Sequence, residues 1–104
     1  MQFAVYRNEN SGSNAECPFL VDVQADLLEE LATRVVIPLA RSAELTGFPT
    51  QYLMPVVVFE GHSYALLTPQ LGGVARDHLG PRVGSLISQA RVISTAIDFL
   101  FRGF

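Results

Sequence analysis

Apolar and polar residues alternate from the start of the chain. In residues 2–7 the apolar side chains of Phe3 and Val5 fall on one side of an extended segment, which predicts a strand. Residues 8–16 are mostly Asn, Ser, Gly and Glu, and this run of turn formers predicts a long, mobile hairpin loop after that strand.

A second alternating segment covers residues 19–24. Its two faces carry Phe19, Val21 and Val23 on one side, and Leu20, Asp22 and Gln24 on the other. This pattern predicts an antiparallel strand whose second face is the wetter one. In residues 25–34 the apolar residues keep a helical spacing over too few turns to predict a long helix. The β-branched residues 34–40 predict a further strand, with Pro38 at an edge or a bulge.

Residues 52–68 are two apolar runs around Glu60, Gly61 and His62, which predicts a hairpin with a tight turn. Residues 71–84 contain four Gly and a Pro, so we expect an irregular segment with one short strand.

From Val83 onward the apolar residues recur at steps of three and four. This spacing predicts a helix of about four to five turns, capped by Gly84 or Ser85 and stopped by Gly103. Its apolar stripe consists of Val83, Leu86, Ile87, Ala90, Ile93, Ile97, Leu100 and Phe101. We therefore predict a mostly β fold of the α+β class, in which five or more antiparallel strands precede one C-terminal helix, in a single domain over residues 1–104.

Composition adds an expectation about assembly. Of the 104 residues, 49% are hydrophobic and 16% are charged. A small domain has a large surface relative to its volume, so an apolar surplus is often covered by a subunit interface, and we expect a homodimer.

The net charge is −3, and the seven basic residues are all Arg, scattered along the chain. This argues against independent nucleic-acid binding, which requires clustered positive charge.

Cys17 is the single cysteine, so no intrachain disulfide is expected, and no group of Cys and His has the spacing of a zinc site. We expect a buried, inert thiol. The sequence shows neither a basic-then-apolar leader nor an apolar run of membrane-spanning length. These features favour a cytoplasmic protein without a metal or cofactor.

No catalytic constellation stands out, and we predict no enzyme activity. His62 and His78 lie in turn-rich segments, where we expect exposed histidines. The acidic residues Asp26, Glu29 and Glu30 are expected to form a solvated face, with a metal site as the alternative. Residues 71–75 have the glycines of a phosphate loop without its Lys, which predicts a turn.

Two surface features remain. Leu27 and Leu28 are adjacent between acids and cannot both face inward, so we expect one to be exposed; the alternative is that both pack beneath the loop. Asp98 and Arg102 are four residues apart on the polar face of the predicted helix, which predicts an exposed ion pair worth about 0.3–0.5 kcal/mol. That face consists of Arg91, Thr95, Asp98 and Arg102.

Four stretches carry a resemblance to a known family. The opening MQFAVY, the stretch FLVDVQADLL, the strand RVVIPLA and the ending AIDFLFRGF resemble, in order and spacing, the CcdB family of toxins from toxin–antitoxin modules. The resemblance implies a homodimer with an SH3-like antiparallel β-barrel, similar to that of MazF, and a long C-terminal helix. It also implies binding to the A subunit of DNA gyrase, a type II topoisomerase, which is trapped on cleaved DNA.

The resemblance also implies site residues. The family's terminal Trp-Gly-Ile falls on Arg102, Gly103 and Phe104, and an Asn one turn earlier falls on Asp98, which gives the gyrase contact. An Ile-Ile pair counted with the antitoxin surface falls on Leu27 and Leu28, and Asp98 and Arg102 share that surface. A CcdA-like antitoxin is the implied second partner, and DNA is implied to be bound only through the antitoxin complex, which represses its own operon.

One departure from the family pattern keeps other functions open. Arg102 replaces a Trp, which removes a large apolar anchor, although Arg is itself frequent among the residues that dominate interfaces. The alternatives are an antitoxin-binding relative that has lost toxicity and a ribonuclease toxin of the MazF or Kid type. The acidic balance of the chain and the missing basic groove argue against the ribonuclease.

Overall fold

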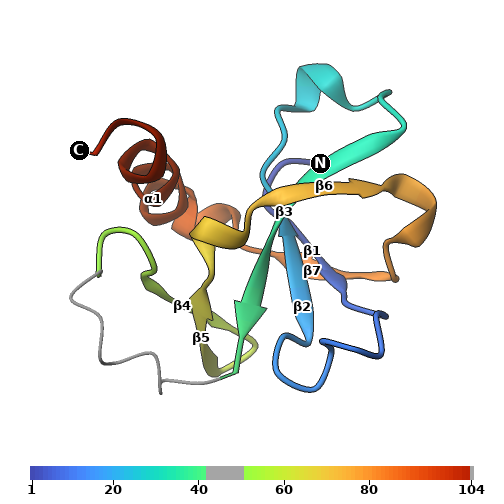
Figure 1. Cartoon of the computed structure of the whole chain (residues 1–104), viewed down its shortest axis with the longest axis horizontal. Coiled ribbons are helices and arrows are strands. Elements are labelled where there is room, and N and C mark those ends of the chain that lie inside the picture. Colours follow the sequence, from blue (N-terminus) through green and yellow to red (C-terminus); the bar gives the residue numbers. More distant parts are fainter. Residues whose placement is uncertain (42–50, 104) are drawn as a thin grey trace.

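The computed structural model describes residues 1–41 and 51–103 (Figure 1). The strands are β1 (Ala4–Arg7), β2 (Phe19–Asp22), β3 (Thr33–Ala40), β4 (Val56–Phe59), β5 (His62–Leu66), β6 (Gly72–Ala75) and β7 (Arg82–Ser85). Short 3-10 turns are η1 (Asp26–Leu28), η3 (Thr68–Gln70), η4 (Arg76–His78) and η5 (Ile87–Gln89), and one α-helix, α1 (Ala90–Arg102), follows them. The predicted α+β class, mostly β with one C-terminal helix, is confirmed.

The strands form one antiparallel sheet in the order β4-β5-β3-β2-β1-β7. Strand β6 pairs with the part of β3 that β5 leaves free. The sheet curls into a half-barrel, and α1 lies beside it near β4 (Figure 1). No helix among the described residues is long and apolar enough to cross a membrane.

Strand β3 is the centre of the sheet because it pairs with three other strands. One edge pairs with β2 from Val36 to Leu39, while the other pairs first with β6, up to Val36, and then with β5, from Leu39. Pro38 lies between these two pairings, and its carbonyl accepts the Leu67 N–H at 3.0 Å. The prediction that Pro38 marks an edge or bulge is wrong. It lies where the neighbouring strand changes, so its missing N–H interrupts no ladder.

Strand β1 starts two residues later than predicted. Phe3 has a φ of 69°, in the left-handed region that a bulky residue rarely adopts. Its N–H donates to Asp22 O at 2.5 Å and its carbonyl accepts the Leu86 N–H at 2.8 Å. Neighbouring segments therefore hold Phe3 in this conformation, and regular pairing begins at Ala4.

The predicted hairpin is confirmed. Val56 to Phe59 pairs with His62 to Ala65, and the two turn residues Glu60 and Gly61 have φ values of 52° and 80°. Two successive positive φ values are the signature of a type I′ turn, whose twist matches that of the strands.

Residues 71–84 contain two strands, β6 and β7, where one was predicted. The glycine-containing residues 71–75 were expected to be a turn, and this is wrong for Gly72–Ala75, which pair with β3 from Thr33 to Val36. The sequence signal was weak because the small side chains leave no apolar alternation to detect.

The C-terminal helix is shorter than predicted. Val83 lies in β7, paired with β1, and α1 begins at Ala90. The predicted cap by Gly84 or Ser85 is wrong: Ser85 Oγ accepts the Ile87 N–H at 3.1 Å, but α1 starts after Gln89 and has no side-chain cap. Leu86 and Ile93 are buried as the stripe requires, but Ile87 and Phe101 are 62% and 69% exposed. Fewer positions of the stripe are therefore buried than predicted. A helix that rests on a curled sheet buries only the face that points toward the sheet.

The core lies between the concave side of the sheet and α1. It is built from Phe3, Val5, Val21, Ile37, Leu39, Val57, Phe59, Tyr64, Leu66, Leu86, Ile93 and Ala96. Phe19 contacts two core rings edge to face, Phe59 at 5.1 Å and Tyr64 at 5.6 Å between centroids. Cys17 is buried, as predicted, in a smaller cluster with Ala40, Ala65 and Leu67. Burial and the charge of Glu16 both raise its pKa.

Two contacts bring the ends of the sheet together. The Phe59 ring of β4 lies directly over Gly84 of β7, where an added Cβ would be 2.5 Å from Phe59 Cε1. Beside it, the Gln89 carboxamide accepts the Val58 N–H at 2.9 Å and donates to Val58 O at 2.7 Å, as a neighbouring strand would. These contacts close the curl and fix the start of α1 against β4.

Gly84→Ala tests this closure. The methyl group would overlap the buried Phe59 ring, so we expect the free energy of unfolding to fall by about 1–3 kcal/mol, measured by urea denaturation. Gly73→Ala is the matched control in another strand, because a Cβ at Gly73 meets nothing within 4 Å. Equal stability of the two variants would contradict the close approach of Phe59.

Candidate functional site

The two adjacent leucines lie in a surface turn. We call residues 25–31 the leucine turn; it contains η1, which has no buried residue. Leu27 is 93% exposed and Leu28 46%, so both leucines face solvent and the alternative that both pack beneath the loop is wrong. Leu31 is also exposed. An apolar surface of this kind on a single turn is typical of a contact site.

A buried ion pair lies beneath the leucine turn. Asp22 is fully buried and Arg34 is 2% exposed. Arg34 Nε donates to Asp22 Oδ2 at 2.9 Å, and Nη2 lies 2.7 Å from the same oxygen. Gln24 is buried as well, and its N–H donates to Asp22 Oδ1 at 2.9 Å. The prediction that this face of β2 is the wetter one is therefore wrong, because its polar groups are paired inside the protein.

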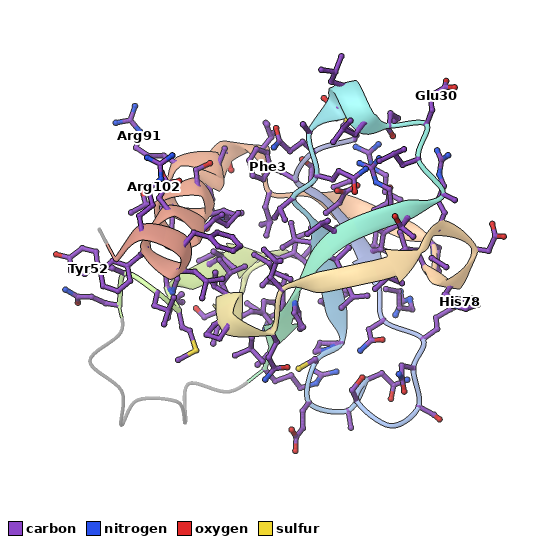
Figure 2. The ribbon with its side chains drawn as sticks, turned by 45° about the horizontal axis from the view of Figure 1, so that its top comes forward. Phe3, Glu30, Tyr52, His78, Arg91 and Arg102 are labelled. Atoms are coloured by element: carbon purple, nitrogen blue, oxygen red, sulfur yellow. The ribbon has the colours of Figure 1, made fainter. Side chains whose placement is uncertain are left out.

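The N-terminal residues join the leucine turn to the rest of the protein. The ammonium group of Met1 donates to Glu29 Oε1 at 2.8 Å, and Gln2 N–H donates to Asp26 Oδ1 at 2.6 Å. The hydrogen bond from this ammonium lowers the pKa of Glu29 below its ordinary value, although desolvation acts in the opposite direction. Figure 2 shows Phe3 between the helix and the turn, consistent with its bond to Leu86.

Two acidic residues of the turn, Asp26 and Glu29, are thus bound by the N-terminal segment. Among residues 1–41 and 51–103, no group of three His, Cys, Asp or Glu side chains could hold a metal ion. Glu30 is exposed and projects from the molecule (Figure 2). A solvated face therefore describes Glu30, while Asp26 and Glu29 bind the N-terminal segment.

The outer face of α1 carries the polar residues that were predicted for it. Arg91, Thr95, Asp98 and Arg102 are all exposed, and Figure 2 shows Arg91 and Arg102 projecting outward. The predicted ion pair between Asp98 and Arg102 is absent from the described part of the chain, where the ion pairs involve Met1, Asp22, Glu29 and Arg34. Asp98 and Arg102 therefore face solvent separately.

The end of the helix is stopped by glycine, as predicted. Gly103 has a φ of 78°, and its N–H donates to Phe99 O at 2.9 Å, which is a left-handed C-cap. Gly103 is exposed, and Phe104 lies outside the described residues. On the flank of α1, Tyr52 stacks on Phe99 with a centroid distance of 6.2 Å. The exposed Phe101 is an apolar residue at the helix end that was assigned to the core from its spacing.

The remaining candidates support no site chemistry. His62 and His78 are exposed, as predicted. A cavity of about 300 Å³ is lined in part by Asn8, Cys17 and His78, and it contains neither a leucine of the turn nor a residue of α1. The leucine turn and the helix end are therefore the two candidate contact surfaces, and the N-terminal residues lie between them.

The comparison with protein families agrees with this arrangement. The family model described as CcdB protein matches residues 2–103, nearly the whole chain. The chain belongs to the CcdB family. Membership confirms the resemblance seen in the sequence and assigns the protein to the toxins of toxin–antitoxin modules as a class. The half-barrel with a C-terminal helix is the fold expected from that resemblance.

The buried pair was missed in the sequence, although a signal was present. Asp22 and Gln24 share one face of the predicted strand over residues 19–24, and Asp22 lies opposite Val36 of β3, two residues from Arg34. Opposite charges at such diagonal positions are within reach of a long side chain. The opposite charges of Asp22 and Arg34 indicate an ion pair once the two segments are considered as neighbouring strands.

Removing the carboxylate tests the buried pair. In Asp22→Ala the Arg34 guanidinium stays buried without its closest partner, and the free energy of unfolding should fall by about 3–5 kcal/mol. The double variant Asp22→Leu with Arg34→Met should recover most of this loss, because it removes both charges. Urea denaturation measures both, and a double variant no more stable than Asp22→Ala would contradict the pairing.

The lowered pKa of Glu29 predicts a pH dependence. A carboxyl group with a lowered folded-state pKa stabilises the protein above its ordinary value of 4.5, and this contribution disappears as the pH falls through the folded-state pKa. Glu29→Gln should therefore lower the urea midpoint at neutral pH and leave it unchanged in acid. Glu30→Gln is the control, and a pH-independent difference for Glu29→Gln would exclude this role.

Proposed function

We propose that this protein is a CcdB-type toxin that binds the A subunit of DNA gyrase and traps the enzyme on cleaved DNA. The observation that carries the proposal is the family match over residues 2–103. The toxin acts by binding, without catalysis, metal or cofactor, and it works in the cytoplasm, where gyrase meets its DNA.

The end of α1 makes the gyrase contact in this proposal, through Asp98, Arg102, Gly103 and Phe104. Asp98 and Arg102 are exposed and do not pair with each other, so each is free to pair with a group on gyrase. Arg102 stands where the family has Trp, and a guanidinium both stacks on aromatic rings and binds carboxylates in a forked geometry. The exposed Phe101 supplies apolar area beside it.

A CcdA-like antitoxin neutralises the toxin in this proposal by contacting Leu27, Leu28, Asp98 and Arg102. The leucine turn and α1 are separate surfaces with residues 1–3 between them, so one partner that covers both must be extended. A segment that is disordered when free can follow such a surface and become ordered as it binds. DNA is contacted by the antitoxin in the complex, because the toxin is acidic.

The toxin acts as a homodimer in this proposal. Support comes from apolar side chains at the surface of the described chain: Val56, Val58, Ile87 and Phe101 are each more than half exposed, at 61%, 52%, 62% and 69%. A monomer in water gains nothing from such exposure, and a second copy would cover part of it.

A DNA cleavage assay tests the proposal. Purified protein, gyrase, supercoiled plasmid and ATP should yield linear, protein-linked DNA. A variant lacking Gly103 and Phe104 should yield little, because two of the proposed contact residues are removed. Leu27→Ser with Leu28→Ser is the matched control: it should still trap gyrase but resist the antitoxin.

No linear DNA at micromolar intact protein would contradict gyrase poisoning. Cleavage of RNA by the same preparation, abolished by an Arg substitution, would instead establish a ribonuclease toxin. Antitoxin binding with neither activity would establish the non-toxic relative.

A further inference from the structure

The leucine turn is too short to hold its own shape. Its helical part is the single turn η1, without a side-chain cap or a buried residue. Leu27, at 93% exposed, gains almost nothing from packing. A turn of this length is marginal by itself, so its conformation depends on bonds to neighbouring elements.

Met1 and Gln2 bind the Glu29 and Asp26 carboxylates of the turn. The bonds from the sheet side converge on one atom, the carbonyl oxygen of Leu28. It accepts the Leu31 N–H at 3.1 Å within the turn. It also accepts Gln24 Nε2 at 2.9 Å and Arg34 Nη1 at 3.4 Å, both from beneath the turn. Because the shortest of these bonds comes from Gln24, this residue provides the main connection between the turn and the sheet.

Gln24 is itself fixed at its other end. Its side-chain Oε1 accepts the Val35 N–H of β3 at 3.0 Å, and its backbone N–H is bound to Asp22. The residue is only 7% exposed. A buried glutamine whose two carboxamide ends bond to separate backbone segments has a single allowed orientation.

We propose that Gln24 is a positioning residue for partner binding: its carboxamide connects β3 to the Leu28 carbonyl and holds Leu27 and Leu28 in the conformation that the antitoxin recognises. This rests on the proposed function of the leucine turn. A surface that is ordered before binding loses less conformational entropy when it is covered, which raises affinity without an added contact. Gln24 contributes in this way although it is almost inaccessible to the partner.

Gln24→Met tests the proposal, with Asn8→Leu as the matched control. Met keeps the length of the side chain and removes both carboxamide bonds. Asn8 is also 7% exposed, and its amide donates to Cys17 O at 2.8 Å, so it ties down a different loop. That loop and the leucine turn lie at opposite ends of the molecule (Figure 1).

The first measurement is native-state thermolysin cleavage within residues 25–31, located by mass spectrometry. We expect about a tenfold faster cleavage in Gln24→Met than in Asn8→Leu at matched stability, because only the first variant frees the turn. Equal cleavage in the two variants would overturn the proposal. Gln24→Glu keeps an acceptor for Val35 and loses the donor to Leu28; it should reproduce the effect and replaces Gln24→Met if that variant does not fold.

The second measurement is the affinity for a peptide that spans the disordered segment of a CcdA-type antitoxin. Gln24→Met should weaken peptide binding about tenfold, and Leu27→Ser should weaken it as well. Asn8→Leu should bind the peptide as tightly as the unaltered protein does. If Leu27→Ser weakens binding and Gln24→Met does not, the positioning role is overturned. If the unaltered protein does not bind the peptide, the proposed function fails, and cleavage alone decides whether Gln24 orders the turn.

Discussion

The half-barrel depends on one close approach, that of the Phe59 ring to the backbone of Gly84. These residues belong to β4 and β7, the two ends of the sheet, so their contact sets how far the sheet curls. The chain leaves β7 directly into η5 and α1, and Gln89 then binds the free edge of β4. The position of the helix, and with it the exposed residues at its end, therefore follows from the absence of a side chain at Gly84.

A second constraint orders the other end of the molecule. Asp22 is buried, and a buried carboxylate must be paired and hydrogen-bonded to be tolerated. Arg34 and the backbone of Gln24 meet that need, and both residues also reach the Leu28 carbonyl. The same network that neutralises the core charge thus holds two leucines in solvent. One hydrogen-bond network therefore accounts both for the buried polar side chains of Asp22, Gln24 and Arg34 and for the exposed leucines of the turn.

The sequence was a good guide where the signal is local. Alternation located β1 and β2, turn chemistry located the hairpin at Glu60 and Gly61, and Gly103 was correctly identified as the helix stop. The family, and hence the residues of the candidate contacts, followed from motif order alone. Errors occurred where the outcome depends on distant residues: Val83 fits the helical spacing, yet it lies in β7, a strand that forms by pairing with β1.

The sequence by itself determined the class of the fold, the family and the types of residue at both candidate surfaces, because periodicity, turn preferences and motif order are properties of neighbouring positions. Only the tertiary structure decided that Asp22 and Gln24 are buried, that Pro38 lies where β3 changes partners, and that Leu27, Leu28 and Phe101 are exposed. The reason is physical. Burial and pairing depend on which strands and turns meet in space, and these contacts join residues that are far apart in the chain.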